Sequence, residues 1–251
     1  MFDVSFIPAF KDNYIWLLRQ GRRAFVVDPG DAAPVLARLE ADGLQLEGIL
    51  ITHHHADHQG GVAELLAHHP AEVFGPAEES ITGRSHPLVG GERIAVLGQD
   101  VRVLAVPGHT LGHLAYVAPG LLFCGDTLFG AGCGRLFEGT PAQMAASLAS
   151  IATLPDETLV YCAHEYTEMN LRFALAVEPD NVALPERVLR VAALRAKGLP
   201  SVPSTLGEEK ATNPFLRCNT ASVIAAGLQH GAADASPTAI FAAIRSWRNG
   251  F

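Results

Sequence analysis

The segment Thr52–His58, THHHADH, places four potential metal ligands within six positions, namely His53, His55, Asp57 and His58. An apolar run typical of a β-strand leads directly into it. Because side chains of an extended chain alternate between two faces, His53 and His55 point to the same side and can bind one metal ion. If a helix then begins, Asp57 and His58 project in a new direction and can bind a second ion. The segment therefore predicts a centre for two metal ions.

Three further ligands follow predicted strands, at His109, Asp126 and His164. Imidazole and carboxylate donors suit zinc, which we expect, with iron or manganese as alternatives. One ion is assigned to His53, His55 and His109, the other to Asp57, His58 and His164, and Asp126 bridges both. Two divalent ions, less two carboxylates and one hydroxide, leave a charge of about +1 at the centre. Such a centre attracts an anionic or polarisable substrate.

The ligand types favour hydrolysis over a purely structural metal site. A structural zinc is usually held in a closed four-ligand shell rich in cysteine, and none of the seven ligands is a cysteine. A water shared by two divalent ions is acidified to a pKa near ~7, so hydroxide is available as a nucleophile. We expect Asp57 to orient this water and Asp126 to act as the second catalytic carboxylate. His54 has no role in this arrangement.

Hydrophobic periodicity predicts the elements that position these ligands. Apolar runs bounded by turn residues predict strands over residues 3–7, 14–18, 24–28, 48–52, 101–106, 114–117, 121–124 and 158–162. Helical spacing and capping residues predict helices over 33–44, 62–66, 167–177, 181–197 and 237–247, and one that starts at Thr140-Pro141. No strand signal follows His164. This order fits a layered α/β body and an all-helical C-terminal part that begins near Tyr166.

Composition narrows the class of protein. The 251 residues are 49% hydrophobic and carry 18 basic and 26 acidic side chains, a formal charge of −8. Net acidity argues against a duplex nucleic-acid binder, and no apolar run approaches the roughly 18 residues of a membrane span. Asp3 and Pro8 interrupt the N-terminal stretch where a secretory signal would be apolar. The four dispersed cysteines are typical of reduced thiols. We therefore expect a cytoplasmic protein that binds neither nucleic acid nor membranes. We also expect a monomer.

The motifs resemble those of a known superfamily. THHHADH, the isolated His109, the GDTLF of Gly125–Phe129 and the single His164 are similar to the metallo-β-lactamase superfamily, which implies an αββα sandwich. Longer stretches resemble its glyoxalase II (hydroxyacylglutathione hydrolase) family. These stretches are FKDNYIW (10–16), VVDPGD (26–31), PGHTLGH (107–113), GDTLFGAGCGRLFEGT (125–140), YCAHEYT (161–167) and NPFLR (213–217).

This resemblance implies a catalytic domain over residues 1–165 and a helical substrate-binding domain over 166–251. The implied reaction is hydrolysis of S-D-lactoylglutathione to glutathione and D-lactate, the second step of methylglyoxal detoxification. By motif, the glutathione part of this thioester would contact Arg135, Phe137, Tyr166 and Arg217. Phe137 stands where some relatives have a tyrosine, and a Cys-Asn-Thr segment follows Arg217 where relatives commonly have a further basic or polar contact.

Four other functions are compatible with the same ligands. A mononuclear-iron persulfide dioxygenase of the same fold would hold one ion and leave the second set of ligands empty. A β-lactamase would be exported, and a nuclease would carry a basic surface instead of a charge of −8. A non-catalytic metal-binding module would bind metal but hydrolyse no thioester. Metal stoichiometry combined with a thioesterase assay separates these alternatives.

Overall fold

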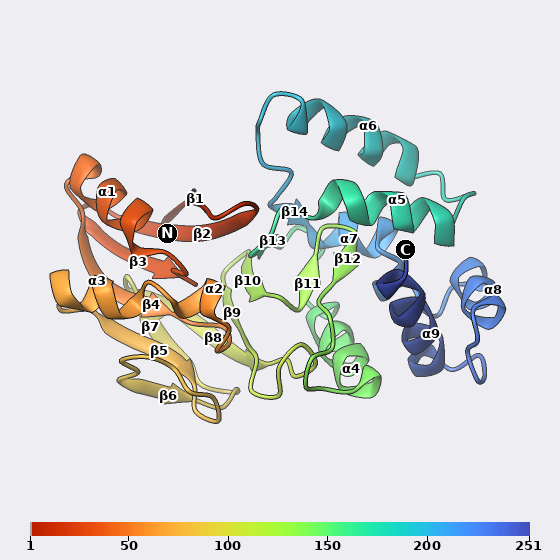
Figure 1. The fold of residues 1–251 in the computed structure, drawn as a ribbon, viewed down its shortest axis with the longest axis horizontal. Coiled ribbons are helices and arrows are strands. Elements are labelled where there is room, and N and C mark those ends of the chain that lie inside the picture. The colour runs from red at the N-terminus through yellow and green to blue at the C-terminus, as the bar shows by residue number, and fades with distance from the viewer. Residues whose placement is uncertain (1) are drawn as a thin grey trace. The chain divides into compact units, whose positions relative to one another are not determined.

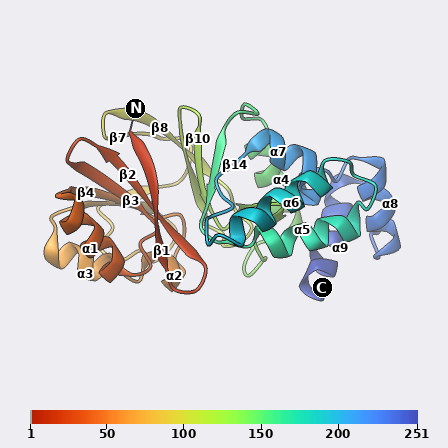
Figure 2. The same ribbon diagram turned by 90° about the horizontal axis from the view of Figure 1, so that it is seen from above.

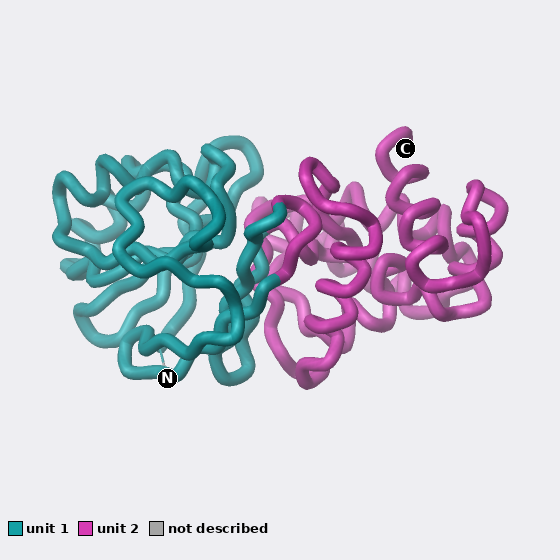
Figure 3. The backbone as a smooth tube through the Cα atoms, turned by 90° about the horizontal axis from the view of Figure 1, so that it is seen from below, with its two compact units in different colours: residues 1–105, 111–125 teal, residues 106–110, 126–251 magenta. Residues whose placement is uncertain are grey.

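A computed structural model describes residues 2–251 of the chain. The chain forms two compact units (Figure 3). Unit 1 contains the residues up to 105 and residues 111–125, and unit 2 contains residues 106–110 and 126–251. The short loop 106–110, which carries His109, therefore belongs to unit 2 although the segments on both sides of it belong to unit 1.

Unit 1 contains two β-sheet layers and a helical layer (Figure 1). Its strands are β1 (Asp3–Ala9), β2 (Asn13–Gln20), β3 (Arg23–Val27), β4 (Gln45–Leu50), β5 (Glu72–Pro76), β6 (His86–Leu88), β7 (Arg93–Val96), β8 (Gln99–Ala105), β9 (Leu114–Ala118) and β10 (Leu121–Gly125). Its helices are α1 (Ala32–Asp42), α2 (Ala56–Gln59) and α3 (Val62–His68). β1 to β3 pair antiparallel and β3 to β6 pair parallel in chain order, whereas β7 to β10 form an antiparallel meander.

The first sheet of unit 1 is covered on one face by α1 and α3, which lie side by side (Figures 1 and 2). Val35 and Leu39 of α1 and Leu65 of α3 are buried in one cluster with alternate residues of the strands. Burial of such apolar faces is the main favourable contribution to folding. Tyr116 of β9 belongs to the second sheet, and its hydroxyl donates a 2.7 Å hydrogen bond to Ile51 O, just past β4. The two sheets of unit 1 are thus joined beside the histidine segment.

Unit 2 is mainly helical. Its strands are β11 (Leu128–Phe129), β12 (Gly132–Cys133), β13 (Leu159–Cys162) and β14 (Ser204–Thr205). Its helices are α4 (Pro141–Ile151), α5 (Thr167–Val177), α6 (Leu184–Arg195), α7 (Leu206–Thr212), α8 (Ala221–Gln229) and α9 (Pro237–Asn249), with a 3₁₀ turn at Pro214–Leu216. β11 and β12 form a hairpin, and β13 pairs with β14. Among residues 2–251, no helix is long and apolar enough to cross a membrane.

Capping chemistry explains where the predicted helices begin and end. Thr140 caps α4 by accepting a hydrogen bond from Gln143 N, and Gln143 accepts one from Thr140 N in return, so the predicted start is confirmed. Gly43 ends α1 at φ +61°, in the left-handed region that glycine adopts without strain. The prediction that no strand follows His164 is wrong, because β14 pairs with β13. Two residues are too few to show a period-two pattern.

Helix α4 supports the loop that carries His109. Ser147 Oγ donates a 2.8 Å hydrogen bond to Pro107 O. Gly108 has a φ of +155°, and a Cβ at this position would lie 2.8 Å from Met144 Cβ and 2.9 Å from Met144 Cα. Glycine is therefore needed for the loop to approach the helix this closely.

Replacing Gly108 with alanine is expected to lower the free energy of unfolding by about 1–3 kcal/mol, the usual cost of overpacking a tight contact. Gly120→Ala is the matched control, because Gly120 also has a positive φ, +75°, but has open space around its Cβ position. Urea unfolding of the wild type and both variants measures the difference. Equal destabilisation by the two variants would contradict a role for the contact with α4.

Candidate functional site

The first cluster of predicted ligands lies in unit 1, where the chain leaves β4. His53 is fully buried. Its Nε2 lies 3.0 Å from His55 Nδ1, and its Nδ1 lies 3.0 Å from Thr52 Oγ1. Two ring nitrogens at this distance can converge on a single ion. The structure therefore brings His53 and His55 together, as their period-two spacing predicts.

Asp28 orients the third histidine of this cluster. This buried carboxylate accepts hydrogen bonds from Thr52 N at 2.8 Å, from Thr52 Oγ1 at 2.7 Å and from His58 Nδ1 at 2.9 Å. Its backbone has a φ of +52°, which is unusual for a residue other than glycine. Because Nδ1 of His58 is held by Asp28, Nε2 is the nitrogen presented to a metal.

Asp57 has its own support. Asn13 Nδ2 donates a 3.1 Å hydrogen bond to Asp57 Oδ2, and the same oxygen lies 3.6 Å from His58 Nε2. Asn13 belongs to the FKDNYIW stretch, and it is a functional candidate that reasoning from ligand spacing did not identify. Its place in the FKDNYIW stretch, which resembles the family, is the sequence signal that could have indicated it.

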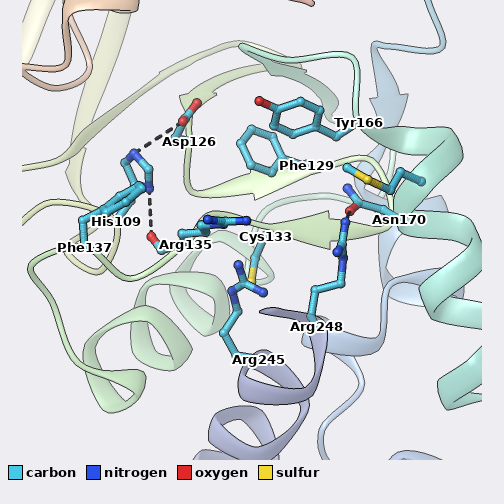
Figure 4. Close-up of a pocket in the computed structure, with 11 residues that line it drawn as sticks. His109, Asp126, Phe129, Cys133, Arg135, Phe137, Tyr166, Asn170, Arg245 and Arg248 are labelled. Atoms are coloured by element: carbon cyan, nitrogen blue, oxygen red, sulfur yellow. Dashed lines mark hydrogen bonds and ion pairs between the residues drawn. The ribbon is translucent and has the colours of Figure 1, made fainter. Parts of the chain in front are cut away.

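The second cluster lies in unit 2 and is centred on Asp126. Asp126 Oδ2 lies 3.4 Å from His109 Nε2 (Figure 4). Its Oδ1 lies 3.3 Å from His164 Nε2. His109 Nδ1 pairs at 2.8 Å with Arg135 O, so its Nε2 is directed at the carboxylate. The ring of His164 stacks on Tyr166, with centroids 4.8 Å apart. The two oxygens of Asp126 thus face different histidines, as a bridging ligand requires.

The donor chemistry of both clusters fits divalent metal ions. All seven predicted ligands belong to groups of His and Asp side chains that could hold a metal ion. Their donors are imidazole nitrogens and carboxylate oxygens, the ligand types that suit zinc, iron and manganese. His54, one residue from two of the ligands, is turned elsewhere, because its N and Nδ1 contact Glu79 Oε2 at 2.6 Å and 3.0 Å.

Next to the second cluster, unit 2 contains a cavity of about 400 Å³, a volume typical of small-molecule sites. Its lining residues are His109, Asp126, Phe129, Cys133, Arg135, Phe137, Tyr166, Met169, Asn170, Arg245 and Arg248 (Figure 4). The lining therefore includes ligands of the candidate metal centre as well as three arginines. Three of the four residues predicted to bind substrate, Arg135, Phe137 and Tyr166, lie in it.

The cavity carries excess positive charge. Arg135, Arg245 and Arg248 line it, and within the described part of the chain Asp126 is the only acidic side chain that does so. Arg245 is only 5% exposed, and its Nη1 has no hydrogen-bond partner among the residues described. Burial lowers the pKa of Arg248, and the positive charges of Arg245 and Arg135 lower it further. An anion placed among these guanidinium groups would relieve their repulsion.

Arg217, the fourth predicted substrate residue, has a different environment. Arg217 is not among the described residues that line the cavity. Its Nε and Nη2 donate hydrogen bonds of 2.7 Å and 3.1 Å to the two oxygens of Glu178, which is buried, and its Nη1 donates to Lys210 O. The geometry therefore assigns Arg217 to packing within unit 2. Arg245 and Arg248 on α9 were missed, although their spacing of three places both on one helical face.

The cysteines near the site are packing thiols. All four cysteines are reduced and buried. Burial raises the pKa of Cys133 to about 12, against the opposing charges of Arg245 and Arg248, and burial also raises the pKa of Cys162 to about 12. At neutral pH both are therefore protonated thiols and poor nucleophiles.

Comparisons with known proteins identify the family of this chain. Residues 10–164 match the family model of the metallo-beta-lactamase superfamily, and residues 165–251 match that of the hydroxyacylglutathione hydrolase C-terminus. A protein of Dechloromonas aromatica (strain RCB) named hydroxyacylglutathione hydrolase is 75% identical over 265 residues and covers 100% of both chains.

Solved structures show the same fold. ETHE1 from Myxococcus xanthus has a TM-score of 0.68 at 26% identity and covers 99% of this chain and 98% of its own. TTHA1623, solved in a di-iron-bound form, has a TM-score of 0.61 at 27% identity and covers 85% of this chain and 100% of its own. The predicted αββα fold with a helical C-terminal region is thus confirmed. The chain belongs to the hydroxyacylglutathione hydrolase family of the metallo-β-lactamase superfamily.

Proposed function

We propose that this chain hydrolyses S-D-lactoylglutathione to glutathione and D-lactate. The observation that carries the proposal is the cavity of unit 2, which is lined by His109 and Asp126 as well as by three arginines. Glutathione carries two carboxylates, and arginine recognises carboxylates through paired hydrogen bonds. The relative at 75% identity, named hydroxyacylglutathione hydrolase, supports this reaction over a mononuclear-iron persulfide dioxygenase.

We further propose that the two clusters together bind two divalent ions, zinc or otherwise iron or manganese. His53, His55 and His109 would hold one ion, Asp57, His58 and His164 the other, and Asp126 both. The ring nitrogens directed away from their protein partners support this assignment. The relative TTHA1623, which binds two irons, supports the stoichiometry. When bound, two such ions supply Lewis acidity that acidifies water and polarises a carbonyl group.

The protein's own residues would position the reactants. Asn13 holds the Asp57 carboxylate, which would orient the attacking water by accepting a hydrogen bond from it. Arg135, Arg245 and Arg248 would hold the carboxylates of the tripeptide, and the rings of Tyr166 and Phe137 would contact its apolar parts. The glutathione thiol has a pKa near ~8.5 and leaves as a thiolate, so no dedicated general acid is needed.

The remaining expectations follow from this function. We propose residues 1–165 as the catalytic domain and 166–251 as the substrate-binding domain, and the two family-model matches, which meet at residues 164 and 165, support this boundary. We propose a monomer in the cytoplasm, and the four buried, reduced cysteines support a reducing compartment. Phe137 is 63% exposed and offers no hydroxyl, so contact with the tripeptide there would be apolar.

Asp126→Ala is expected to remove metal and activity together, because each oxygen of Asp126 faces a different histidine. Loss of even an indirect metal partner costs roughly 10- to 100-fold in metal affinity or activity, and loss of a bridging ligand should cost at least that. Metal analysis and a lactoylglutathione assay on one preparation measure both effects. His54→Ala is the control and should retain metal. Metal content unchanged in Asp126→Ala would contradict the bridging assignment.

Arg248→Ala is expected to raise KM for lactoylglutathione with little change in kcat. A charge-assisted hydrogen bond is worth roughly 1.5–3 kcal/mol, or about 10- to 150-fold in affinity. An interaction that is equally strong in the bound substrate and in the transition state changes KM alone. A simple thioester without the tripeptide should not detect the substitution.

Arg217→Ala is the matched arginine variant, because its guanidinium is bound to Glu178 and does not line the cavity. It should lower thermal stability and leave KM near the wild-type value. A rise in KM for Arg217→Ala but not for Arg248→Ala would reverse the assignment of the two residues.

A further inference from the structure

Glu209 on α7 is a fully buried carboxylate that takes no part in the reaction described above. Oε1 accepts hydrogen bonds from Ser204 Oγ at 2.6 Å and from Arg187. Oε2 accepts hydrogen bonds from Ala131 N at 2.8 Å and from Asn213 Nδ2 at 3.1 Å. Four donors thus converge on one side chain, and two of them, Arg187 and Ala131, belong to segments far from α7 in the sequence.

The bond to Ala131 reaches the hairpin of β11 and β12, which forms part of the cavity wall. Phe129 and Cys133 of this hairpin line the cavity, and Arg135 follows directly after it. Asn213 Nδ2 also donates to Phe129 O at 3.2 Å and to Gly132 O at 2.9 Å. The Glu209–Asn213 pair therefore contacts the backbone of the hairpin at three residues.

The hairpin needs such support. Each of its strands has two residues, and an isolated hairpin is marginally stable even when longer. Ala131 at its turn has a φ of +54°, a left-handed conformation that is unfavourable for a residue with a Cβ. Strain of this kind persists only where surrounding contacts hold it. The bond from Ala131 N to Glu209 acts on the strained residue itself.

The ionised form of the carboxylate matches its four donors. Arg187 is almost fully buried beside it; burial by itself would lower the pKa of Arg187, but the charge of Glu209 and their hydrogen bond raise it. A glutamine of the same size would direct an amide NH₂ group at two donors, and buried donors left without an acceptor are costly. Replacement of the carboxylate by an amide should therefore break the hydrogen bonds on one side of the side chain. These are either the bonds from Ala131 and Asn213 or the bonds from Ser204 and Arg187.

We propose that Glu209, together with Asn213, is a positioning residue that sets the affinity for the glutathione part of the substrate by holding the β11–β12 hairpin. This inference rests on the proposed function. The described residues that line the cavity include neither Glu209 nor Asn213. Both therefore act through Phe129, Cys133 and Arg135.

The test compares Glu209→Gln with Glu208→Gln. Glu208 is the adjacent residue on α7, and its partly exposed carboxylate pairs with the buried Arg187 and the exposed Arg190. It therefore controls for the loss of a carboxylate paired with Arg187. Glu209→Gln should raise KM for lactoylglutathione about 5- to 20-fold, the effect of losing one or two buried hydrogen bonds. Its kcat, its metal content and its activity on a thioester without the tripeptide should stay near wild type. Glu208→Gln should leave all four quantities unchanged.

Equal losses on both thioesters, or loss of metal, would overturn the inference, because Glu209 would then be a general structural residue. A similar rise in KM for Glu208→Gln would also overturn it. If Glu209→Gln fails to fold, Asn213→Ala removes the bonds to Phe129 O and Gly132 O without removing a charge, and it should show the same rise in KM. An unchanged KM in Asn213→Ala would overturn the inference by itself.

Calorimetric binding of glutathione separates this inference from the proposed function. An active wild type whose Kd for glutathione matches that of Glu209→Gln would refute the positioning role alone. A wild type that neither binds glutathione nor hydrolyses lactoylglutathione would refute the proposed function, and this inference with it.

Discussion

The candidate site depends on one interaction that recurs in both units: one nitrogen of an imidazole is held by the protein so that the other has a defined direction. His58 Nδ1 is held by Asp28, and His109 Nδ1 by Arg135 O. Such a partner selects the tautomer and the ring orientation that a metal ligand requires. Asp28 adopts a φ of +52° in doing so. The geometry of each cluster is therefore set by residues that are not themselves ligands.

Buried charged side chains in this protein differ in how completely they are hydrogen-bonded. Asp28 and Glu209 are buried carboxylates whose oxygens accept several hydrogen bonds, which offsets the cost of removing a charge from water. Arg245, also buried, lines the cavity, and its Nη1 has no hydrogen-bond partner among residues 2–251. Saturated charges hold backbone segments in place, whereas the unsaturated one is available to an anionic ligand. This contrast links the packing of unit 2 to the proposed recognition of carboxylates.

Local patterns account for what could be predicted. The helix expected over residues 167–177 has those bounds in the structure, and the predicted N-cap of α4 is confirmed, because helical periodicity and capping act within a few residues. The candidate ligand histidines could also be identified from local pattern, since each lies in or just after an apolar run that predicts a strand. The hairpin of β11 and β12 and the strand β14 were not predicted, because strands of two residues show no periodicity and depend on distant partners such as Asn213.

The sequence by itself determined which residues can bind metal, which reaction class they suit and which family the chain resembles, because these depend on residue types and on spacing along the chain. Only the tertiary structure decided which arginines face the cavity. The sequence alone does not distinguish the four arginines Arg135, Arg217, Arg245 and Arg248. In the structure, Arg217 is neutralised by Glu178, 39 residues away in sequence. The other three line the cavity. The availability of a charge depends on its neighbours in space, and folding alone brings those neighbours together.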